Sequence, residues 1–251
     1  MGMTDAILLG AGLGTRFAQS RGSSAELPKQ FQMLAEKPVF IWSLQTLLKH
    51  LNLRHVIFVV PAEFNEISRE LAKKHLTSDQ LEILEFIEGG LRRQDSSENA
   101  LLHLSHKLPL PQKVIIHDAC RPFISQGMLQ EVQNRLSHPN PQAWIPVVPV
   151  VETVKRVKHD QVVETLDRSQ LFRVQTPQIF DFSQIASLFE QLRKSPDRNF
   201  TFTDDASILE HFNIKVGTFP GDERNIKLTY EFELDILRYN LLSNTRNPSC
   251  D

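Results

Sequence analysis

Three glycines at alternate positions follow a short apolar run near the start of the chain. Residues 6–9 read Ala-Ile-Leu-Leu, and residues 10–16 read Gly-Ala-Gly-Leu-Gly-Thr-Arg. An apolar run that ends in glycines predicts a buried strand, followed by a loop whose backbone passes close to something bulky and polar. The N–H groups of such a loop bind anions, and Arg16 and Lys29 bring two cations to the same place. The stretch therefore predicts an anion site, with Gly10, Ala11, Gly12 and Gly14 as its backbone contacts.

Two known phosphate motifs do not account for this loop. The dinucleotide fingerprint would place its third glycine at position 15, where the chain has Thr15. A P-loop needs Gly-Lys followed by Ser or Thr, and the loop does not contain it. A plain turn with solvated surface cations stays open as the alternative for this stretch taken alone.

A second group of polar residues follows the apolar segment at 81–87. Two glycines at its start allow close approach of the backbone to a base, and an arginine and a serine offer polar contacts to a nucleotide. Asp95 and Glu98 form a capping-box pattern, which predicts that a helix begins at Asp95. A plain turn remains the alternative. The candidate nucleotide contacts here are Gly89, Gly90, Arg93 and Ser96.

An aspartate and an arginine follow the apolar segment at 114–117. Asp118 is well placed to bind a ribose hydroxyl or a hydrated Mg²⁺, because hard cations prefer oxygen ligands. Arg121 can make a bidentate contact to a phosphate. An Asp–Arg pair that only braces the loop is the alternative. Cys120 lies between them, but nothing in the sequence supplies it with a base.

Composition excludes several classes of protein. The chain has 251 residues and a net charge of −2, which argues against a general nucleic-acid binder. No apolar run approaches the length of a membrane span, and the start of the chain lacks a signal-peptide pattern. Cys120 and Cys250 are the only cysteines, so a disulfide framework is not expected. His103 and His106 have the spacing of metal ligands but no third partner nearby. These features predict a cytoplasmic protein with no protein-ligated metal at the histidine pair.

Strand and helix patterns alternate along the chain, which predicts an α/β fold. The expected architecture is a Rossmann-like, mostly parallel sheet with helices on both faces. Ligands bind such sheets at the carboxyl ends of the strands, so the polar residues above should meet there. We expect a single domain at 1–243 and a flexible tail at 244–251. The predicted strands are 6–9, 55–60, 81–87, 114–117, 144–151 and 214–219, and the predicted helices include 38–50, 63–75 and 182–192, with a last one from about 230.

The segment at 151–174 departs from this alternation. Residues 153–158 and 161–165 alternate polar and apolar side chains around His159 and Asp160, which predicts a β-hairpin. A lone hairpin is only marginally stable in water, so its apolar face needs a partner. A second copy of the chain is the economical partner, which predicts a twofold homodimer. Thr153 and Arg168 lie on this arm and would reach the pocket of the other copy.

The polar residues gathered in this way suit phosphoryl chemistry. They supply cations, hydroxyls and one carboxylate, but no evident Ser/His/Asp set and no zinc signature. Catalysis of phosphoryl transfer depends mainly on positioning and charge neutralisation, and a phosphate monoester that attacks is already anionic and needs no general base. The set consists of Arg16, Lys29, Arg168 and Lys227, the hydroxyls of Thr153, Thr176 and Thr203, and Asp118.

Taken together, these motifs resemble the methylerythritol phosphate cytidylyltransferase family of the non-mevalonate isoprenoid pathway. The resemblance covers the chain from Ala6 to about Leu234. The motifs that carry it are the loop at 10–16 with Pro28-Lys29-Gln30, Gly89-Gly90 with Arg93 and Ser96, His117-Asp118 with Arg121-Pro122, Thr153-Val154-Lys155, Asp167-Arg168, Gln175-Thr176-Pro177-Gln178, Thr203-Asp204 and Asn225-Ile226-Lys227.

The resemblance implies a reaction and residue roles. CTP and methylerythritol phosphate would give the cytidine diphosphate alcohol and pyrophosphate, with Mg²⁺ held largely by the triphosphate. Arg16 and Lys29 would stabilise charge on the α-phosphate, while Lys227 and Arg168 of the other subunit would position the attacking phosphate. The polyol site would be lined by Asp118, Arg121, Thr153, Thr176 and Thr203, in an arm-exchanged dimer.

Three other functions are weighed against this one. Ribitol phosphate cytidylyltransferase has the same fold and chemistry with another acceptor, and the opening loop does not exclude it. A Rossmann dehydrogenase would bind a nicotinamide cofactor, and the missing third glycine counts against it. A non-catalytic nucleotide-binding protein would bind CTP without turnover.

Overall fold

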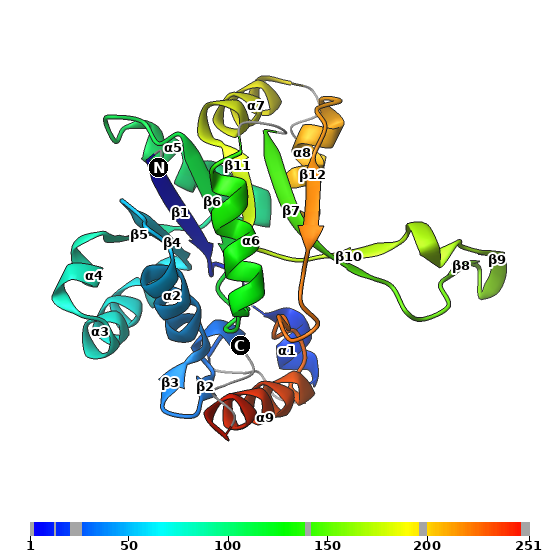
Figure 1. Ribbon diagram of the computed structural model, residues 1–251, viewed down its shortest axis with the longest axis horizontal. Helices are drawn as coiled ribbons and strands as arrows, with labels where there is room; N and C mark the ends of the chain where they lie inside the picture. The colour runs from blue at the N-terminus through cyan, green and yellow to red at the C-terminus, as the bar shows by residue number, and fades with distance from the viewer. Residues whose placement is uncertain (1–2, 13, 21–26, 139–141, 196–199, 247–251) are drawn as a thin grey trace.

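A large mixed β-sheet forms the centre of the molecule, and helices cover both of its faces (Figure 1). The structure is a computed structural model that describes residues 3–12, 14–20, 27–138, 142–195 and 200–246. The sheet order is β10-β7-β11-β6-β1-β4-β5, and β12 pairs with β7. Its strands are β1 (Thr4–Leu9), β4 (Val56–Val60), β5 (Leu84–Glu88), β6 (Lys113–Asp118), β7 (Ala143–Pro149), β10 (Phe172–Val174), β11 (Gln178–Asp181) and β12 (Gly217–Pro220).

The strands that carry the expected site are parallel. β1 lies between β4 and β6 and pairs with both in parallel, and β5 extends this block. Only β10 and β11 run against their neighbours. The predicted α/β class with a mostly parallel, helix-covered sheet is confirmed, and the carboxyl ends of β1, β4, β5 and β6 share one edge.

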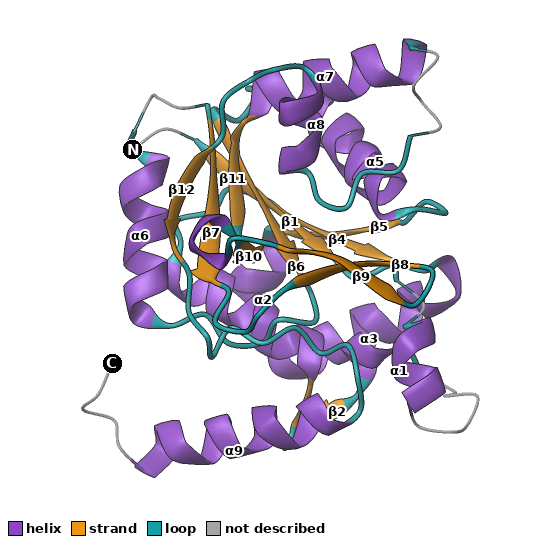
Figure 2. Ribbon diagram, turned by 90° about the vertical axis from the view of Figure 1, so that its right-hand side faces the viewer, coloured by secondary structure: helices purple, strands orange, loops and turns teal. Residues whose placement is uncertain are grey.

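Alternate residues of the central strands enter two separate hydrophobic cores. Ala6 and Leu8 face the helices α2 (Val39–His50), α3 (Asn65–His75) and α6 (Gln126–Leu136). Ile7 and Leu9 face α5 (Arg93–Ser105), α7 (Phe182–Lys194) and α8 (Ala206–His211). Figure 2 shows the helices on the two sides of the sheet. Because side chains alternate across a strand, continuous apolar strands require cover on both faces.

A third, smaller core joins both ends of the chain below the sheet edge. Phe17 of α1 (Thr15–Ser20) packs with Leu228, Leu234 and Leu237. The last two residues belong to α9 (Phe232–Arg246), which also contacts the short β2 (Met33–Leu34), the partner of β3 (Lys37–Pro38). This core therefore packs the helix after the glycine loop against the segment that follows Lys227.

Several predicted boundaries are wrong, each for a local reason. β5 begins only at Leu84, because Thr77 caps a short helix α4 (Ser78–Glu82) in front of it. Asp95 is not the start of α5: it is the third residue of the helix and accepts a hydrogen bond from the N–H of Arg92 at 3.0 Å. β7 ends at Pro149, β12 begins at Gly217 and α9 begins at Phe232.

The predicted hairpin is present and projects from the body (Figure 1). β8 (Lys155–Lys158) and β9 (Gln161–Thr165) form a two-stranded sheet of their own. His159 and Asp160 turn the chain with φ of 49° and 59°, values typical of a tight hairpin turn. The arm leaves Val157, Val162 and Val163 exposed at 58%, 62% and 60%. An apolar surface of this kind on a projecting hairpin needs cover.

Some earlier expectations fall on residues that the structure does not describe. Leu13, residues 21–26 between α1 and Lys29, and residues 247–251 of the predicted tail lie outside the described residues. α9 itself extends to Arg246. Within the described ranges, no helix has the length and hydropathy needed to cross a membrane.

Candidate active site

Three loops meet at the shared edge of the parallel strands. The N–H of Gly10 donates to Val59 O at 2.8 Å, and the N–H of Ala119 donates to Leu9 O at 2.9 Å. The second glycine pair touches the first loop directly, since a Cβ added at Gly89 would lie 2.1 Å from the Cβ of Ala11. The predicted meeting of the loops after β1, β5 and β6 is therefore present.

The first glycine loop is held by a buried glutamine. Gln30 Nε2 donates to the carbonyl oxygens of Gly10 and Gly12, the latter at 3.2 Å. Gly14 has a φ of 68°, a backbone conformation that favours glycine, and it lies beside Lys29. Gln30 engages the loop carbonyls and so holds the conformation of the loop. The sequence reasoning quoted Gln30 only as part of a motif and gave it no role.

Arg16 and Lys29 frame this loop, as predicted. Arg16 lies in the first turn of α1 and is exposed, and Lys29 is half-buried. Lys29 follows the buried Pro28 in a short 3₁₀ turn over Lys29–Phe31, whose Phe31 packs into the core against Phe40. The buried Gln30 and Phe31 thus anchor the turn and place the backbone and the start of the Lys29 side chain beside Gly14.

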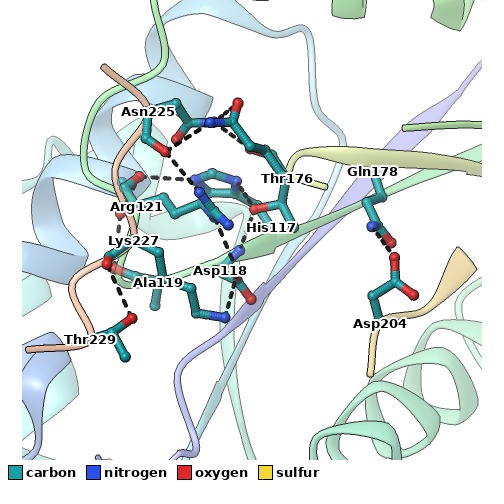
Figure 3. Close-up of polar contacts among 12 residues, drawn as sticks. His117, Asp118, Ala119, Arg121, Thr176, Gln178, Asp204, Asn225, Lys227 and Thr229 are labelled. Atoms are coloured by element: carbon teal, nitrogen blue, oxygen red, sulfur yellow. Dashed lines mark hydrogen bonds and ion pairs between the residues drawn. The ribbon is translucent and has the colours of Figure 1, made fainter. Parts of the chain in front are cut away.

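The carboxylate of Asp118 lies close to three cationic side chains, one from its own loop and two from distant segments of the chain. Its Oδ2 lies 2.9 Å from Lys227 Nζ and 3.3 Å from Arg121 Nε (Figure 3). Its Oδ1 lies 3.7 Å from Arg93 Nε. Burial alone would raise the pKa of Asp118, but the charges of Lys227, Arg93 and Arg121 outweigh it and hold that pKa well below its ordinary value. Asp118 therefore stays ionised and organises the positive charge around it.

Arg93 and Ser96 serve this centre from α5. Arg93 Nη1 lies 2.7 Å from Asp205 Oδ2, and Asp205 is almost fully buried. Burial would lower the pKa of Arg93, but Asp205 and Asp118 together raise it. Ser96 Oγ accepts the N–H of Gly90 at 3.1 Å and shapes the second glycine turn. Both residues were predicted as direct nucleotide contacts, and both already have protein partners.

A closed ring of hydrogen bonds lies behind Asp118 (Figure 3). His117 Nε2 donates to Arg121 O at 3.1 Å, and Arg121 Nη1 donates to Asn225 O at 2.7 Å. Asn225 Nδ2 donates to Thr176 O at 2.8 Å, and Thr176 Oγ1 lies 2.9 Å from His117 Nδ1. Burial lowers the pKa of His117 to about 4, so its ring is neutral at physiological pH. His117 and Asn225 belong to two separate sequence motifs, and no local pattern predicts that they share this ring.

The predicted polyol-site residues fall into two groups. Arg121 and Thr176 are 9% and 4% exposed and belong to the buried ring. Thr203 is exposed and precedes Asp204, whose carboxylate accepts a hydrogen bond from Gln178 at 2.8 Å (Figure 3). Thr203 thus remains open to a ligand, while the hydroxyl of Thr176 is already engaged.

Thr153 and Arg168 lie on the arm. Both are exposed, and Arg168 Nη1 donates to Val151 O at 2.7 Å. The arm that carries them extends away from the body in Figure 1.

The side chains do not form a metal centre of their own. Among the described residues, no group of three or more His, Cys, Asp or Glu side chains is placed to hold a metal ion. Asp118 faces three cationic side chains, which disfavour direct binding of a divalent cation there. His103 Nε2 lies 2.9 Å from Glu85 Oε2, which also accepts from Lys107 at 2.8 Å. The site is therefore built for anions, with lysine and arginine beside two glycine turns.

Comparison with known proteins gives the family. The model of the family "IspD: 2-C-methyl-D-erythritol 4-phosphate cytidylyltransferase" matches residues 4–241. A protein of that name from Solibacter usitatus is 33% identical over 92% of this chain and 92% of its own length, and one from Bacillus cereus is 34% identical over 90% and 92%. A bifunctional enzyme IspD/IspF from Bartonella tribocorum is 36% identical, and the chain spans about half (54%) of its length.

The fold agrees with this assignment. A solved structure of 2-C-methyl-D-erythritol 4-phosphate cytidylyltransferase from Francisella tularensis is 25% identical and superposes with a TM-score of 0.75, over 94% of this chain and 99% of that one. The matched region includes both glycine turns, Asp118 and Lys227. This chain belongs to the 2-C-methyl-D-erythritol 4-phosphate cytidylyltransferase (IspD) family.

Proposed function

We propose that this protein joins CTP and 2-C-methyl-D-erythritol 4-phosphate to give the cytidine diphosphate alcohol and pyrophosphate. Family membership supports the substrates. The observation that carries the proposal is the cluster around Asp118, where Lys227, Arg121 and Arg93 converge beside the two glycine turns. Such a cluster suits a reaction whose main obstacle is repulsion between two polyanions.

The step is a displacement at the α-phosphorus of CTP. An oxygen of the methylerythritol phosphate forms a new P–O bond, and the bond between the α-phosphorus and the bridging oxygen to the β-phosphate breaks. The electron pair leaves with pyrophosphate, and no proton has to be removed from the nucleophile. Arg16 and Lys29, which border the first glycine loop, stabilise the charge that accumulates on the α-phosphate.

The attacking phosphate is positioned from a second direction. Lys227 reaches the site from the segment before α9, and its ammonium is held at Asp118 until a phosphate arrives. Arg168 of a second copy is the further cation, because its own arm carries it away from the body. Thr153 of that copy lines the polyol site together with Thr203, Asp118 and Arg121. The nucleotide contacts are Gly10, Ala11, Gly12, Gly14, Gly89 and Gly90, with Arg93 and Ser96 holding the second turn.

Three further parts belong to this proposal. Mg²⁺ would be held largely by the triphosphate and would neutralise part of its charge. The protein acts as a homodimer in which the arm at 151–174 of each copy covers its exposed valines against the other copy. Residues 1–243 form the nucleotidyltransferase domain.

A coupled assay of pyrophosphate release tests the function. The protein is incubated with CTP and either methylerythritol phosphate or ribitol 5-phosphate, with and without Mg²⁺. We expect turnover with CTP and methylerythritol phosphate that depends on Mg²⁺. Preference for ribitol 5-phosphate would reassign the acceptor. Binding of CTP without turnover on either polyol phosphate would make the protein a non-catalytic nucleotide binder.

A further inference from the structure

The hydrogen-bond ring behind Asp118 connects the three segments that carry the charged groups of the site. His117 and Arg121 come from the end of β6 and the loop after it, Thr176 precedes β11, and Asn225 lies in the segment that leads to Lys227. All four are buried, with exposures of 0%, 9%, 4% and 1%. A ring of this kind is rigid because each member is held by two others.

The partners assign the protons in this ring. Arg121 O can only accept, so the single proton of the neutral His117 ring lies on Nε2. His117 Nδ1 is then an acceptor, and the Thr176 hydroxyl must donate to it. The Thr176 oxygen is left free to accept the N–H of Asp118 at 3.1 Å. The backbone of Asp118 is thus fixed by an oriented chain that ends at His117.

The same ring reaches Lys227. Arg121 Nη1 holds Asn225 O, and Asn225 Nδ2 holds Thr176 O, so the segment at 225–227 is tied to the same two residues that orient Asp118. Ser43 Oγ of α2 also donates to Arg121 O at 3.1 Å, which anchors the ring to the core. A shift at His117 would therefore move Asp118 and Lys227 relative to each other.

We propose that His117 is a positioning residue for the reaction, which sets the Asp118 carboxylate and, through Thr176 and Asn225, the Lys227 ammonium that receives the attacking phosphate. His117 is fully buried and does not touch substrate itself. This role rests on the proposed function, since it assigns His117 to the polyol phosphate half of that site. The CTP half, at the glycine turns, is held separately by Gln30.

Kinetics of two variants test the positioning role. His117→Leu removes both ring nitrogens, whereas His117→Asn keeps an acceptor near the position of Nδ1 for the Thr176 hydroxyl. We expect His117→Leu to lower kcat/KM for the polyol phosphate on the order of tenfold to a hundredfold, with the KM for CTP little changed, and His117→Asn to recover part of the loss. A rise in the KM for CTP as large as the loss for the polyol phosphate, or no loss of kcat/KM for the polyol phosphate in His117→Leu, would overturn the role.

A measurement without substrates keeps the inference falsifiable if His117→Leu fails to fold. The ¹⁵N chemical shifts of the imidazole in the native protein at neutral pH report the tautomer, and we expect the proton on Nε2. A proton on Nδ1, or a charged imidazole, would contradict the hydrogen-bond ring. If the native protein turns over no polyol phosphate, the proposed function is wrong. The tautomer of His117 shows separately whether the hydrogen-bond ring exists.

Discussion

Lys227 and Asp118 form an ion pair of 2.9 Å between segments that lie far apart in the sequence. The side chain of Lys227 is 34% exposed and that of Asp118 only 7%, so the lysine faces the open side and the aspartate the interior. An incoming phosphate meets the lysine first and competes with Asp118 for it. The pair thus keeps a cation in place before the substrate binds, at a cost that the substrate's own charge offsets.

Replacing Lys227 by Ala should abolish most turnover and leave CTP binding largely intact. Asp118 would retain Arg121 and Arg93, so the centre keeps its fold while losing the cation that faces the attacking phosphate. We expect kcat to fall by about 10²- to 10³-fold, as for loss of one group that stabilises developing charge. Steady-state kinetics and CTP titration by calorimetry measure the two effects.

Lys215→Ala is the matched control, because Lys215 is an exposed lysine that lies after α8 and outside the described site. It should retain native kinetics. Unchanged turnover in Lys227→Ala would contradict the assignment of this lysine.

Gly89→Ala should weaken CTP binding through a steric contact between the two glycine turns. The added Cβ would lie 2.1 Å from the Cβ of Ala11, a distance that forces one turn to move. We expect the KM for CTP to rise about tenfold or more, with a smaller effect on the polyol phosphate. Gly127→Ala is the control, since a Cβ there meets nothing within 4 Å and the residue lies in α6. Native CTP affinity in Gly89→Ala would show that the turns do not meet as described.

The free energy of unfolding should decrease as the pH is lowered, in a range set by the pKa of His117. Burial lowers the pKa of His117 from 6.5 to about 4, so the unfolded chain binds a proton that the folded protein refuses. Proton binding therefore stabilises the unfolded state relative to the folded state as the pH drops through 6.5, and the resulting loss of protein stability is complete only near pH 4. The native protein should lose about 3 kcal/mol more than His117→Asn over this interval.

Urea unfolding of both proteins at several pH values measures this difference. Other groups titrate in both proteins and cancel in the comparison. Asp118 adds no slope between pH 6.5 and its ordinary range, because its pKa is depressed and its contribution is lost only at lower pH. Parallel stability profiles for the two proteins would mean that His117 accepts a proton in the folded state at little cost.

Local patterns in the sequence were enough to predict the sheet and the loops at its edge. Alternating apolar strands and helices favour a parallel sheet with helical cover, and the residues after β1, β5 and β6 meet at the carboxyl ends of its strands. Boundaries were wrong where a short local motif competed with the strand pattern, as at α4, where Thr77 caps a helix in front of β5. The exposed valines of the arm were predictable because period-two alternation in a lone hairpin leaves an uncovered face.

The partners inside the site could not be predicted from the sequence. Ring closure at His117 depends on Asn225 and Thr176, which lie far from it in the chain and meet only after the sheet has formed. Arg93 and Ser96 were predicted to contact the nucleotide directly, because no local pattern shows that Asp205 and Gly90 bind them. Such contacts follow from tertiary packing, not from spacing.

Mixing two inactive variants tests whether Arg168 acts across the dimer. In the proposed arrangement each site uses Lys227 from one copy and Arg168 from the other. Arg168→Ala and Lys227→Ala should each be nearly inactive alone. A mixed dimer has one site with both native cations, so random reassortment should restore about a quarter of the native sites. The readout is pyrophosphate release after joint refolding of equal amounts of the two variants.

The outcome separates the two possible placements of Arg168. If Arg168 served the site of its own chain, every site in the mixed dimer would lack one cation and no activity would return. The arm geometry argues against this, because Arg168 binds Val151 O at the base of a hairpin that leaves the body. Replacing Val162, which is 62% exposed on the arm, by Asp should lower both dimer content and restoration, since a charge in the covered face opposes arm exchange. Full restoration by a protein that stays monomeric would contradict the dimer.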